Sequence, residues 1–259
     1  MDGLLMAIII MQRENGMKNH AVLCRGFTLI EVMVAVAVFG IISTAIYATY
    51  HNQQRIYLDQ EKIVEMQQNV RAALFFIERD VRMMGYDPTE QTDAANASST
   101  VANIAELRFA YDENSDGTLQ STEYIRYALK PVGGSSIIEN GLAGGVRCCL
   151  ARETGIGSSA SGLQPVIDNV EALEFVYHLA DGTTTTDCPT QSDRANIRSI
   201  DVSLLVRTSS LVHGYLDTKK YYPASNHDRS DTGTVWGPFN DGYRRRLLIS
   251  NIKCRNMGL

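Results

Sequence analysis

The sequence lacks the short motifs by which many enzymes are recognised. It has no P-loop for phosphate, no G-x-G-x-x-G nucleotide fingerprint and no G-x-S-x-G around a nucleophilic serine. His178, His213 and His227 have no Glu or Cys at the spacing of a metal site, and no C-x-x-C pair occurs. These absences give a catalytic role no support, and we do not expect the chain to be an enzyme.

An excess of basic residues is also missing. The 259 residues include 24 Lys and Arg against 29 Asp and Glu, for a formal net charge of −5. Proteins that bind nucleic acid by its phosphates carry clustered Lys and Arg. We therefore expect no nucleic-acid partner.

Charge is almost absent from residues 27–50. Glu31 is the only Asp, Glu, Lys, Arg or His side chain between Phe27 and Tyr50. An apolar segment of about 20 residues is long enough to cross a bilayer as a helix. A carboxylate at the bilayer centre costs on the order of 2.5–3.5 kcal/mol on insertion scales. The sequence thus predicts a transmembrane helix and a partner for the charge of Glu31.

Residues 26–31 read Gly-Phe-Thr-Leu-Ile-Glu, which resembles the processing site of type IV prepilins and of the pseudopilins of type II secretion systems. In these families, prepilin peptidase cuts after the glycine and methylates the new amino terminus. The resemblance implies a cut between Gly26 and Phe27, N-methylation of Phe27, and a pairing of Glu31 with the amino terminus of Phe27 on a neighbouring subunit.

The resemblance implies four segments: a leader at 1–26 that is removed, a transmembrane and assembly helix at 27–50, its amphipathic continuation at 51–85, and a head at 86–259. Leaders of this family are short and basic, and Met17 begins one that carries Lys18 and Arg25, so we expect Met17 to be the true start. Positive charge stays cytoplasmic. The head is therefore expected in the periplasm.

An apolar stripe indicates that the helix continues beyond the membrane. Its members recur every three or four residues after one step of seven: Ile56, Ile63, Met66, Val70, Leu74, Ile77, Val81 and Met84. Gly85 and Pro88 then form a stop signal. Residues 89–102 are polar without periodicity and are expected to be an exposed loop.

Runs typical of strands follow in the head. They lie at 106–111, 123–129, 146–151, 172–179, 197–207 and 243–253. The expected fold class is therefore α+β and type IV pilin-like, with one long N-terminal helix packed on an antiparallel β-sheet head.

Three runs in the head, at 169–175, 203–207 and 242–247, look more weakly like minor pilins of the PilW type. Ala48 stands where many major pilins have proline, which also favours a minor pilin or a pseudopilin. The resemblance implies an inner-membrane protein that joins an initiation or tip complex of the pilus. Its implied partners are prepilin peptidase, other minor and major pilins, the inner-membrane assembly platform and membrane lipid.

Two other functions are compatible with this sequence. One is that of a minor pseudopilin of type II secretion, a class of protein that has the same N-terminal features. The other is a tip adhesin or ligand-binding module that uses the aromatic-rich segment 215–240 for cell adhesion.

The exported part contains four of the five cysteines: Cys148, Cys149, Cys188 and Cys254. Disulfides form in oxidising compartments. A bond between the adjacent Cys148 and Cys149 would close a strained ring, so we expect this pair to bond across to Cys188 and Cys254, in an order that the sequence leaves open.

Residues 112–123 fit the pattern of an EF-hand loop, in which oxygen ligands surround a tight turn at Gly117. The ligands would be Asp112, Asn114, Asp116, Thr118, Gln120 and Glu123, and calcium would be the only cofactor. The flanks read as strands, however, and a hairpin turn rich in Asn, Asp and Gly explains the same residues.

The run Arg244-Arg245-Arg246 has two interpretations. It could contact acidic partners or lipid. Alternation in a strand would instead place its members on two faces, with one arginine buried or paired, and we favour this second interpretation.

Overall fold

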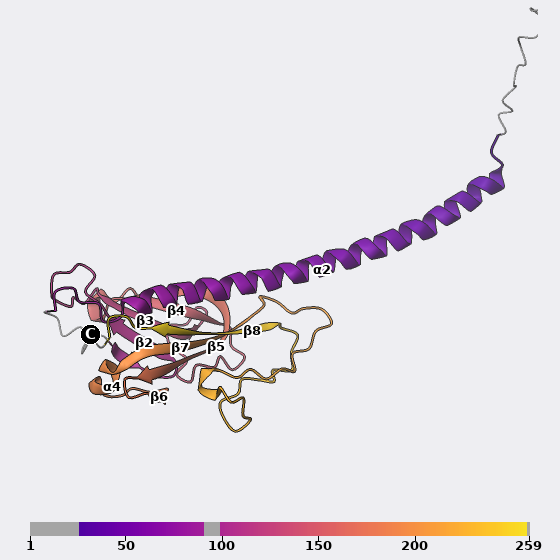
Figure 1. The fold of residues 1–259 in the computed structure, drawn as a ribbon. Helices are drawn as coiled ribbons and strands as arrows, with labels where there is room; N and C mark the ends of the chain where they lie inside the picture. The colour runs from indigo at the N-terminus through magenta and orange to yellow at the C-terminus, as the bar shows by residue number, and fades with distance from the viewer. Residues whose placement is uncertain (1–25, 91–98, 258–259) are drawn as a thin grey trace, which may run out of the picture. The chain divides into compact units, whose positions relative to one another are not determined.

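The computed structural model describes residues 26–90 and 99–257. Two compact units divide the chain, at residues 1–54 and 55–259. Helix α2 (Leu29–Met83) contributes to both. Figure 1 labels helices and strands of the chain, and the order of the strands follows from their pairing.

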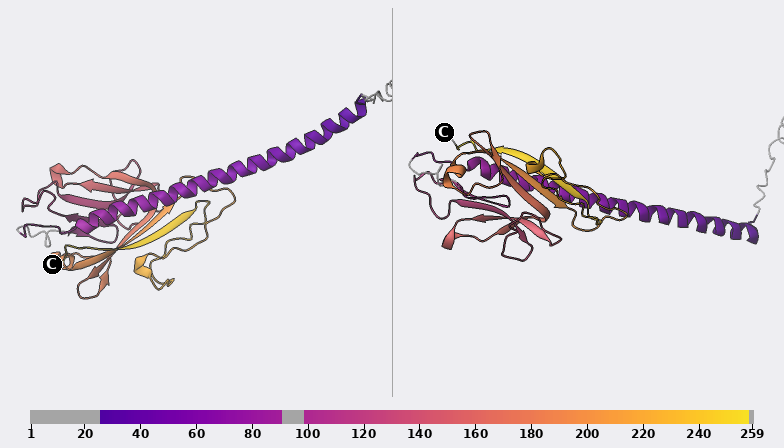
Figure 2. Two further views of the ribbon diagram at one scale, coloured as in Figure 1. Left: turned by 45° about the horizontal axis from the view of Figure 1, so that its top comes forward. Right: turned by 90° about the horizontal axis from the view of Figure 1, so that it is seen from below.

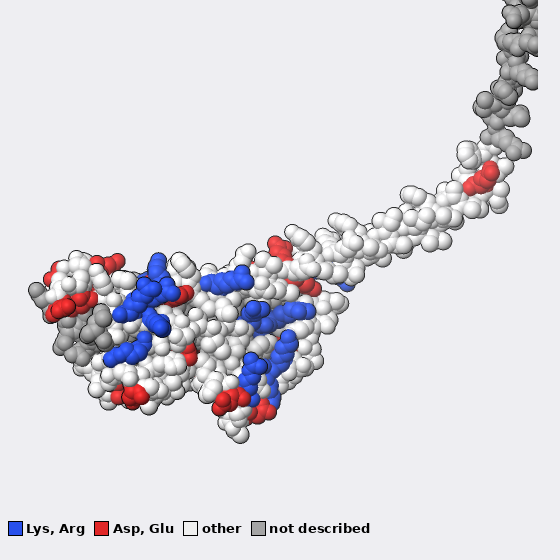
Figure 3. All heavy atoms as spheres, viewed as in Figure 1, with Lys and Arg blue, Asp and Glu red and all other residues white. Residues whose placement is uncertain are grey.

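In the first unit, the described residues form the beginning of α2. Within the described part of the chain, α2 is the one helix long and apolar enough to cross a membrane, judged by length and composition, and its most apolar 18-residue window has a mean hydropathy of 2.4. None of that window is buried by the protein itself. Figure 3 shows this stretch as nearly free of charged side chains. The predicted apolar helix is thus present, with its side chains facing outward.

The second unit packs the rest of α2 on a single antiparallel sheet (Figures 1 and 2). Seven strands follow the order β1-β2-β3-β4-β5-β7-β8, and β6 pairs with β5. The strands are β1 (Ser99–Ala102), β2 (Glu106–Ala110), β3 (Tyr124–Pro131), β4 (Cys148–Thr154), β5 (Gln164–Leu179), β6 (Thr184–Thr185), β7 (Ile197–Arg207) and β8 (Arg245–Lys253). Short helices η1 (Gly157–Ser159), α4 (Gln191–Ala195) and η2 (Ala224–Asn226) lie in the connections. The predicted α+β fold class, a long helix on an antiparallel sheet, is confirmed.

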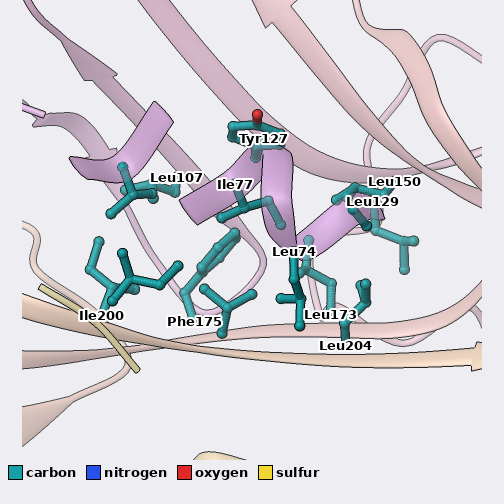
Figure 4. Packing of buried hydrophobic residues seen from close by; sticks show 14 of the residues in the cluster. Leu74, Ile77, Leu107, Tyr127, Leu129, Leu150, Leu173, Phe175, Ile200 and Leu204 are labelled. Atoms are coloured by element: carbon teal, nitrogen blue, oxygen red, sulfur yellow. The ribbon is translucent and has the colours of Figure 1, made fainter. Parts of the chain in front are cut away.

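The core lies between α2 and the sheet. Figure 4 shows Leu74 and Ile77 of α2 facing Tyr127, Phe175 and Leu204, which come from three strands. Ile77 and Tyr127 are completely buried. Residues three and four apart share one face of a helix, which is why the apolar stripe reaches the core from Ile63 onward. The predicted stripe also included Ile56, and this prediction is wrong, because half of the side chain remains exposed.

The stop signal after α2 is confirmed at Gly85. Its φ of +74° is a left-handed conformation that favours glycine. A Cβ on Gly85 would lie 2.7 Å from the sulfur of Met257, so the C-terminal segment packs directly against this turn. The end of α2 is therefore fixed both by backbone conformation and by a close contact.

Most strand boundaries differ from expectation by one to three residues, and two parts of the sheet differ by more. The polar segment 89–102 was predicted to be a loop, but Ser99–Ala102 forms β1 on β2; residues 91–98 lie outside the described part. Strand β5 begins eight residues before the predicted start at Ala172. Its early half contains Pro165, Asp168 and Asn169, and Asn169 has a φ of +61° next to register shifts. These bulges hide the alternation that marks a strand.

Candidate functional site

The predicted processing site lies just before the first turn of α2. Gly26 has no heavy atom within 4 Å of the position a Cβ would take, and Phe27 is 88% exposed. Thr28 is exposed and precedes the first helical residue, Leu29. An exposed segment outside a helix or strand is what a protease needs to reach a backbone bond. The motif is therefore accessible in this unit.

Glu31 and Thr28 form a capping box. The Glu31 carboxylate accepts hydrogen bonds from the Thr28 N–H (2.9 Å) and hydroxyl (3.0 Å). In return, the Thr28 hydroxyl oxygen accepts the N–H of Glu31 at 3.3 Å. Such reciprocal bonds satisfy donors that a helix start leaves unpaired. The acid also stands at the positive end of the helix dipole. These bonds hold the carboxylate at the start of the helix, on an exposed surface.

Apolar hollows flank Glu31 on the surface of α2. One is lined by Ile30, Val34 and Val38, and a second by Phe27, Val32 and Val36. Ala35 and Phe39 line both. The small side chain of Ala35 lets a neighbouring helix approach closely. The carboxylate is thus the one charged group in a surface otherwise suited to helix packing.

The predicted calcium loop folds around its own backbone. The buried Asp112 carboxylate accepts the N–H groups of Asp116 and Gly117, and Glu123 accepts three further N–H groups of the loop. Asn114, Thr118 and Gln120 bond to Asp116. Among the residues described, no group of three or more His, Cys, Asp or Glu side chains is placed to hold a metal ion. Calcium binding remains a prediction from the sequence.

A buried charge cluster holds the long segment between β7 and β8 against the sheet. The Arg245 guanidinium bonds to Asp217 (3.0 Å) and Asp241 (2.6 Å), and its carbon lies 3.9 Å from the centre of the Phe239 ring. Arg207 pairs with Glu171 at 2.7 Å. Burial disfavours the charge of Arg245, but bonds to carboxylates outweigh it and raise its pKa.

The two neighbours of Arg245 are exposed. The favoured interpretation, in which strand alternation buries and pairs one arginine of the three, therefore describes what the structure shows.

The aromatic-rich segment 215–240 offers few aromatic rings to a ligand. Trp236 and Tyr221 are buried against Leu205 and Ala172, and they form an isolated antiparallel bridge. The Tyr221 hydroxyl bonds to Asp217, and burial together with that carboxylate raises its pKa. These rings therefore stabilise the segment instead of forming a binding face.

The four cysteines are free and buried. Cys148 and Cys149 are neighbours in β4, so their side chains point to opposite faces of the sheet. Cys148 lies opposite Val170 of β5, and Val170 lies opposite Val206 near the end of β7. This pair therefore occupies one end of the sheet.

Cys188 and Cys254 lie elsewhere. The Cys254 N–H bonds to Arg198, eight positions before Val206 and so roughly 26 Å from it along β7. The Cys188 N–H bonds to Ala102 at the end of β1, two residues before Ile104, which accepts the N–H of Phe175 in β5. Phe175 is five positions, or roughly 16 Å along β5, from Val170, the partner of Cys148. A disulfide needs Cα atoms within about 7 Å. The predicted cross-pairing is wrong, because the four thiols are free and the distances along the strands exceed this limit.

One ion pair between α2 and the sheet was not found from the sequence. Asp80 interrupts the buried face of α2, and its carboxylate accepts bonds from Arg152 and Tyr127. The sequence did contain a signal for this contact, because a charged residue at a helix position that faces the core needs a partner.

Two family models match the sequence. Residues 23–47, which include Gly26, Phe27 and Glu31, match the prokaryotic N-terminal methylation motif. Residues 59–210, more than half of the chain, match prepilin peptidase-dependent protein B. No curated protein matches. Among solved structures, the chain is similar to the type IV-like pilin TTHA1219 from Thermus thermophilus, with 14% identity, a TM-score of 0.47, and coverage of 75% of this chain and all of that one.

Proposed function

This chain belongs to the prepilin peptidase-dependent protein B family, and on that premise we propose that it is a minor pilin of the PilW type in a type IV pilus. The observation that carries the proposal is the open Gly26–Phe27 bond directly before an exposed apolar helix. Prepilin peptidase would cut there and methylate Phe27. The role is structural, in an initiation or tip complex with other minor and major pilins.

The proposed assembly step buries the apolar surface of α2 between neighbouring helices. Phe27, Leu29 and Phe39 are each at least 70% exposed in the single chain. Burying apolar surface contributes about 25 cal/mol per Å². Without a partner chain, only lipid can cover these side chains. Helix bundling after extraction from the membrane is therefore favourable, and it keeps the apolar face away from water.

Glu31 gives the assembly its register. In the proposed contact, the Glu31 carboxylate pairs with the ammonium group of the processed Phe27 on a neighbour. In low dielectric an unpaired charge is costly and a paired one much less so. The apolar hollows around Glu31 are the place where the neighbouring phenylalanine would pack.

The proposed location follows from the same segment. Residues 27–50 would span the inner membrane once, with Lys18 and Arg25 on the cytoplasmic side before cleavage. The head would wait in the periplasm and later reach the pilus surface. Contact with the inner-membrane assembly platform would transfer the chain from lipid to fibre.

The test is a count of surface pili by electron microscopy in a clean deletion and in the complemented strain. Loss of pili that complementation restores is the expected result. Unchanged pili with lost export of secreted proteins would instead identify a minor pseudopilin of type II secretion, which shares the motif and the absence of proline at Ala48. Unchanged pili and unchanged export, with lost surface binding, would identify a tip adhesin.

A further inference from the structure

A groove of about 470 Å³ lies in the second unit, where the last turns of α2 pass the segment that follows β8. Among the residues that line it are Phe75, Glu78, Arg79, Arg82 and Met83 of α2 and Arg255 of the C-terminal segment. It shares no residue with the core, the charge cluster around Arg245 or the processing motif. Its composition calls for a separate explanation.

The apolar part of the groove is on the outward face of α2. Phe75 is 63% exposed and Met83 37% exposed, although Leu74 and Ile77 beside them are buried. Position 79 is four residues after 75, three before 82 and four before 83, so these positions lie on one side of the helix. Exposed aromatic and methionine side chains beside arginine are typical of interfaces between proteins. This face of α2 therefore has the character of a contact surface.

The charged part of the groove is positive. Arg79, Arg82 and Arg255 line it with one carboxylate, Glu78, which pairs with Arg82. Arg79 forms an ion pair with the buried Asp80, which also pairs with Arg152. Arg255 is exposed and forms no ion pair with any residue in the ranges that the structure describes. Figure 3 shows basic side chains spread over the visible face of the unit, with one group toward the end of α2.

We propose that this groove docks an acidic segment of a different pilin subunit in the same assembly, with an Asp or Glu side chain beside an apolar one. Arginine presents a planar fork of N–H donors that matches a carboxylate, and Phe75 offers a flat apolar surface next to it. Charge complementarity identifies the occupant: the groove has an excess of two positive charges within a chain that is acidic overall. The proposal rests on the proposed function, because it needs a neighbouring pilin.

The experiment uses the full chain in its own cells, with a photoreactive benzoylphenylalanine in place of Phe75. Illumination should cross-link this position to one peptide of another pilin, and mass spectrometry should find Asp or Glu in that peptide. Arg255→Glu should lower the yield about tenfold, the effect of replacing attraction by repulsion across an interface. Reversing the charge of the partner's acidic residue should restore it.

Three variants make the result specific. Arg79→Glu combined with Arg255→Glu should abolish the cross-link. Arg244→Glu combined with Arg246→Glu, a matched double change at exposed positions outside the groove, should leave it unchanged. The single Arg255→Glu change keeps the test valid if a second acidic side chain next to the buried Asp80 unfolds the double variant.

Other outcomes overturn the proposal. These are a cross-link to a second copy of this chain, to lipid, or to no pilin, and a yield that Arg255→Glu does not change. A second photoprobe at Val36, in the apolar helix, separates this failure from failure of the proposed function. Cross-links to pilins from position 36 but not from position 75 reject only the proposal that the groove is a docking site. Absence of pilin cross-links from both positions also rejects the proposed minor pilin function.

Discussion

Asp80 of α2 and Arg152 of β4 are joined by a hydrogen-bonded ion pair of 2.7 Å at the edge of the core. The same Asp80 oxygen accepts the Tyr127 hydroxyl of β3, also at 2.7 Å. Asp80 is only 5% exposed, so its charge depends on these partners. Two strands and the helix thus share one carboxylate, which fixes how α2 lies on the sheet.

Removing this carboxylate should destabilise the second unit. We expect Asp80→Ala to lower the free energy of unfolding by roughly 2–3 kcal/mol, because Arg152 and the Tyr127 hydroxyl lose a charged acceptor. Thermal unfolding of the detergent-solubilised chain, followed by circular dichroism, measures the effect. Arg79→Ala is the control, since its side chain is half exposed and should change the melting temperature little. Equal melting temperatures for both variants would contradict the assigned role.

Acid should loosen the segment between β7 and β8. Hydrogen bonds from Arg245 hold the pKa of Asp241 below its usual range, against a smaller opposing effect of burial. A carboxyl whose pKa is lowered by folding stabilises the protein above its unfolded pKa of about 4, and this stabilisation is lost as the pH falls through the folded pKa.

Stability should therefore decrease as the pH is lowered below about 4, and Asp241→Asn should weaken that dependence. Melting temperatures of both chains between pH 7 and pH 3 give the measurement. Parallel curves for the two chains would show that Asp241 does not contribute to it.

The cysteines should never join the two ends of the sheet. No disulfide between Cys148 or Cys149 and either Cys188 or Cys254 is expected, because the fold separates them by more than such a bond can span. Cys188 bonds next to Asn103, which accepts the Tyr177 hydroxyl, and Cys254 bonds to Arg198, next to the β7 partner of His178. A bond between these two cysteines is therefore the one pairing that the geometry leaves open.

Burial raises the pKa of the Cys188 thiol to about 11 and that of Cys254 to about 12, so both should resist alkylation until the chain unfolds. Peptide mapping of the protein purified without reducing agent checks the pairing. A cross-linked peptide that contains Cys148 or Cys149 would show that the register of β4 is wrong.

The periodic parts of the chain could be predicted and the irregular parts could not. The stripe from Ile63 to Val81 marks the buried face of α2, and β7 has the bounds predicted from its strand-like run, because local sequence alone decides both. Partners across the sheet carry no local signal. Arg152 reaches Asp80 over 72 positions, so neither residue identifies the other in the sequence. The separation of the cysteines likewise depends on strand order.

Cleavage should depend on Gly26. A side chain at position 26 would lie next to the peptide bond that prepilin peptidase must bind and would obstruct its binding. The structure itself has room for a Cβ at this position. Gly26→Ala should therefore leave folding unchanged and cause the uncleaved precursor to accumulate. The matched control is Gly40→Ala in the apolar helix, where a Cβ also meets no atom within 4 Å. Electrophoretic mobility in cells with and without the peptidase measures both. A shortened Gly26→Ala product would refute the assigned bond.

Glu31 has two separable contributions, a helix cap and a charge. Glutamine can still accept the Thr28 N–H and hydroxyl, since Gln and Glu both complete a capping box, but it carries no charge for a neighbouring ammonium group. Glu31→Gln should thus be cleaved at the normal rate and retain its helix, yet reduce surface pili at least about tenfold, as expected when a buried charge loses its partner. Glu31→Ala removes both contributions and should also lower helix content at the start of α2. Pili are counted by electron microscopy and cleavage is followed by mobility. Normal piliation with Glu31→Gln would exclude the charge pair and leave the cap as the function of this residue.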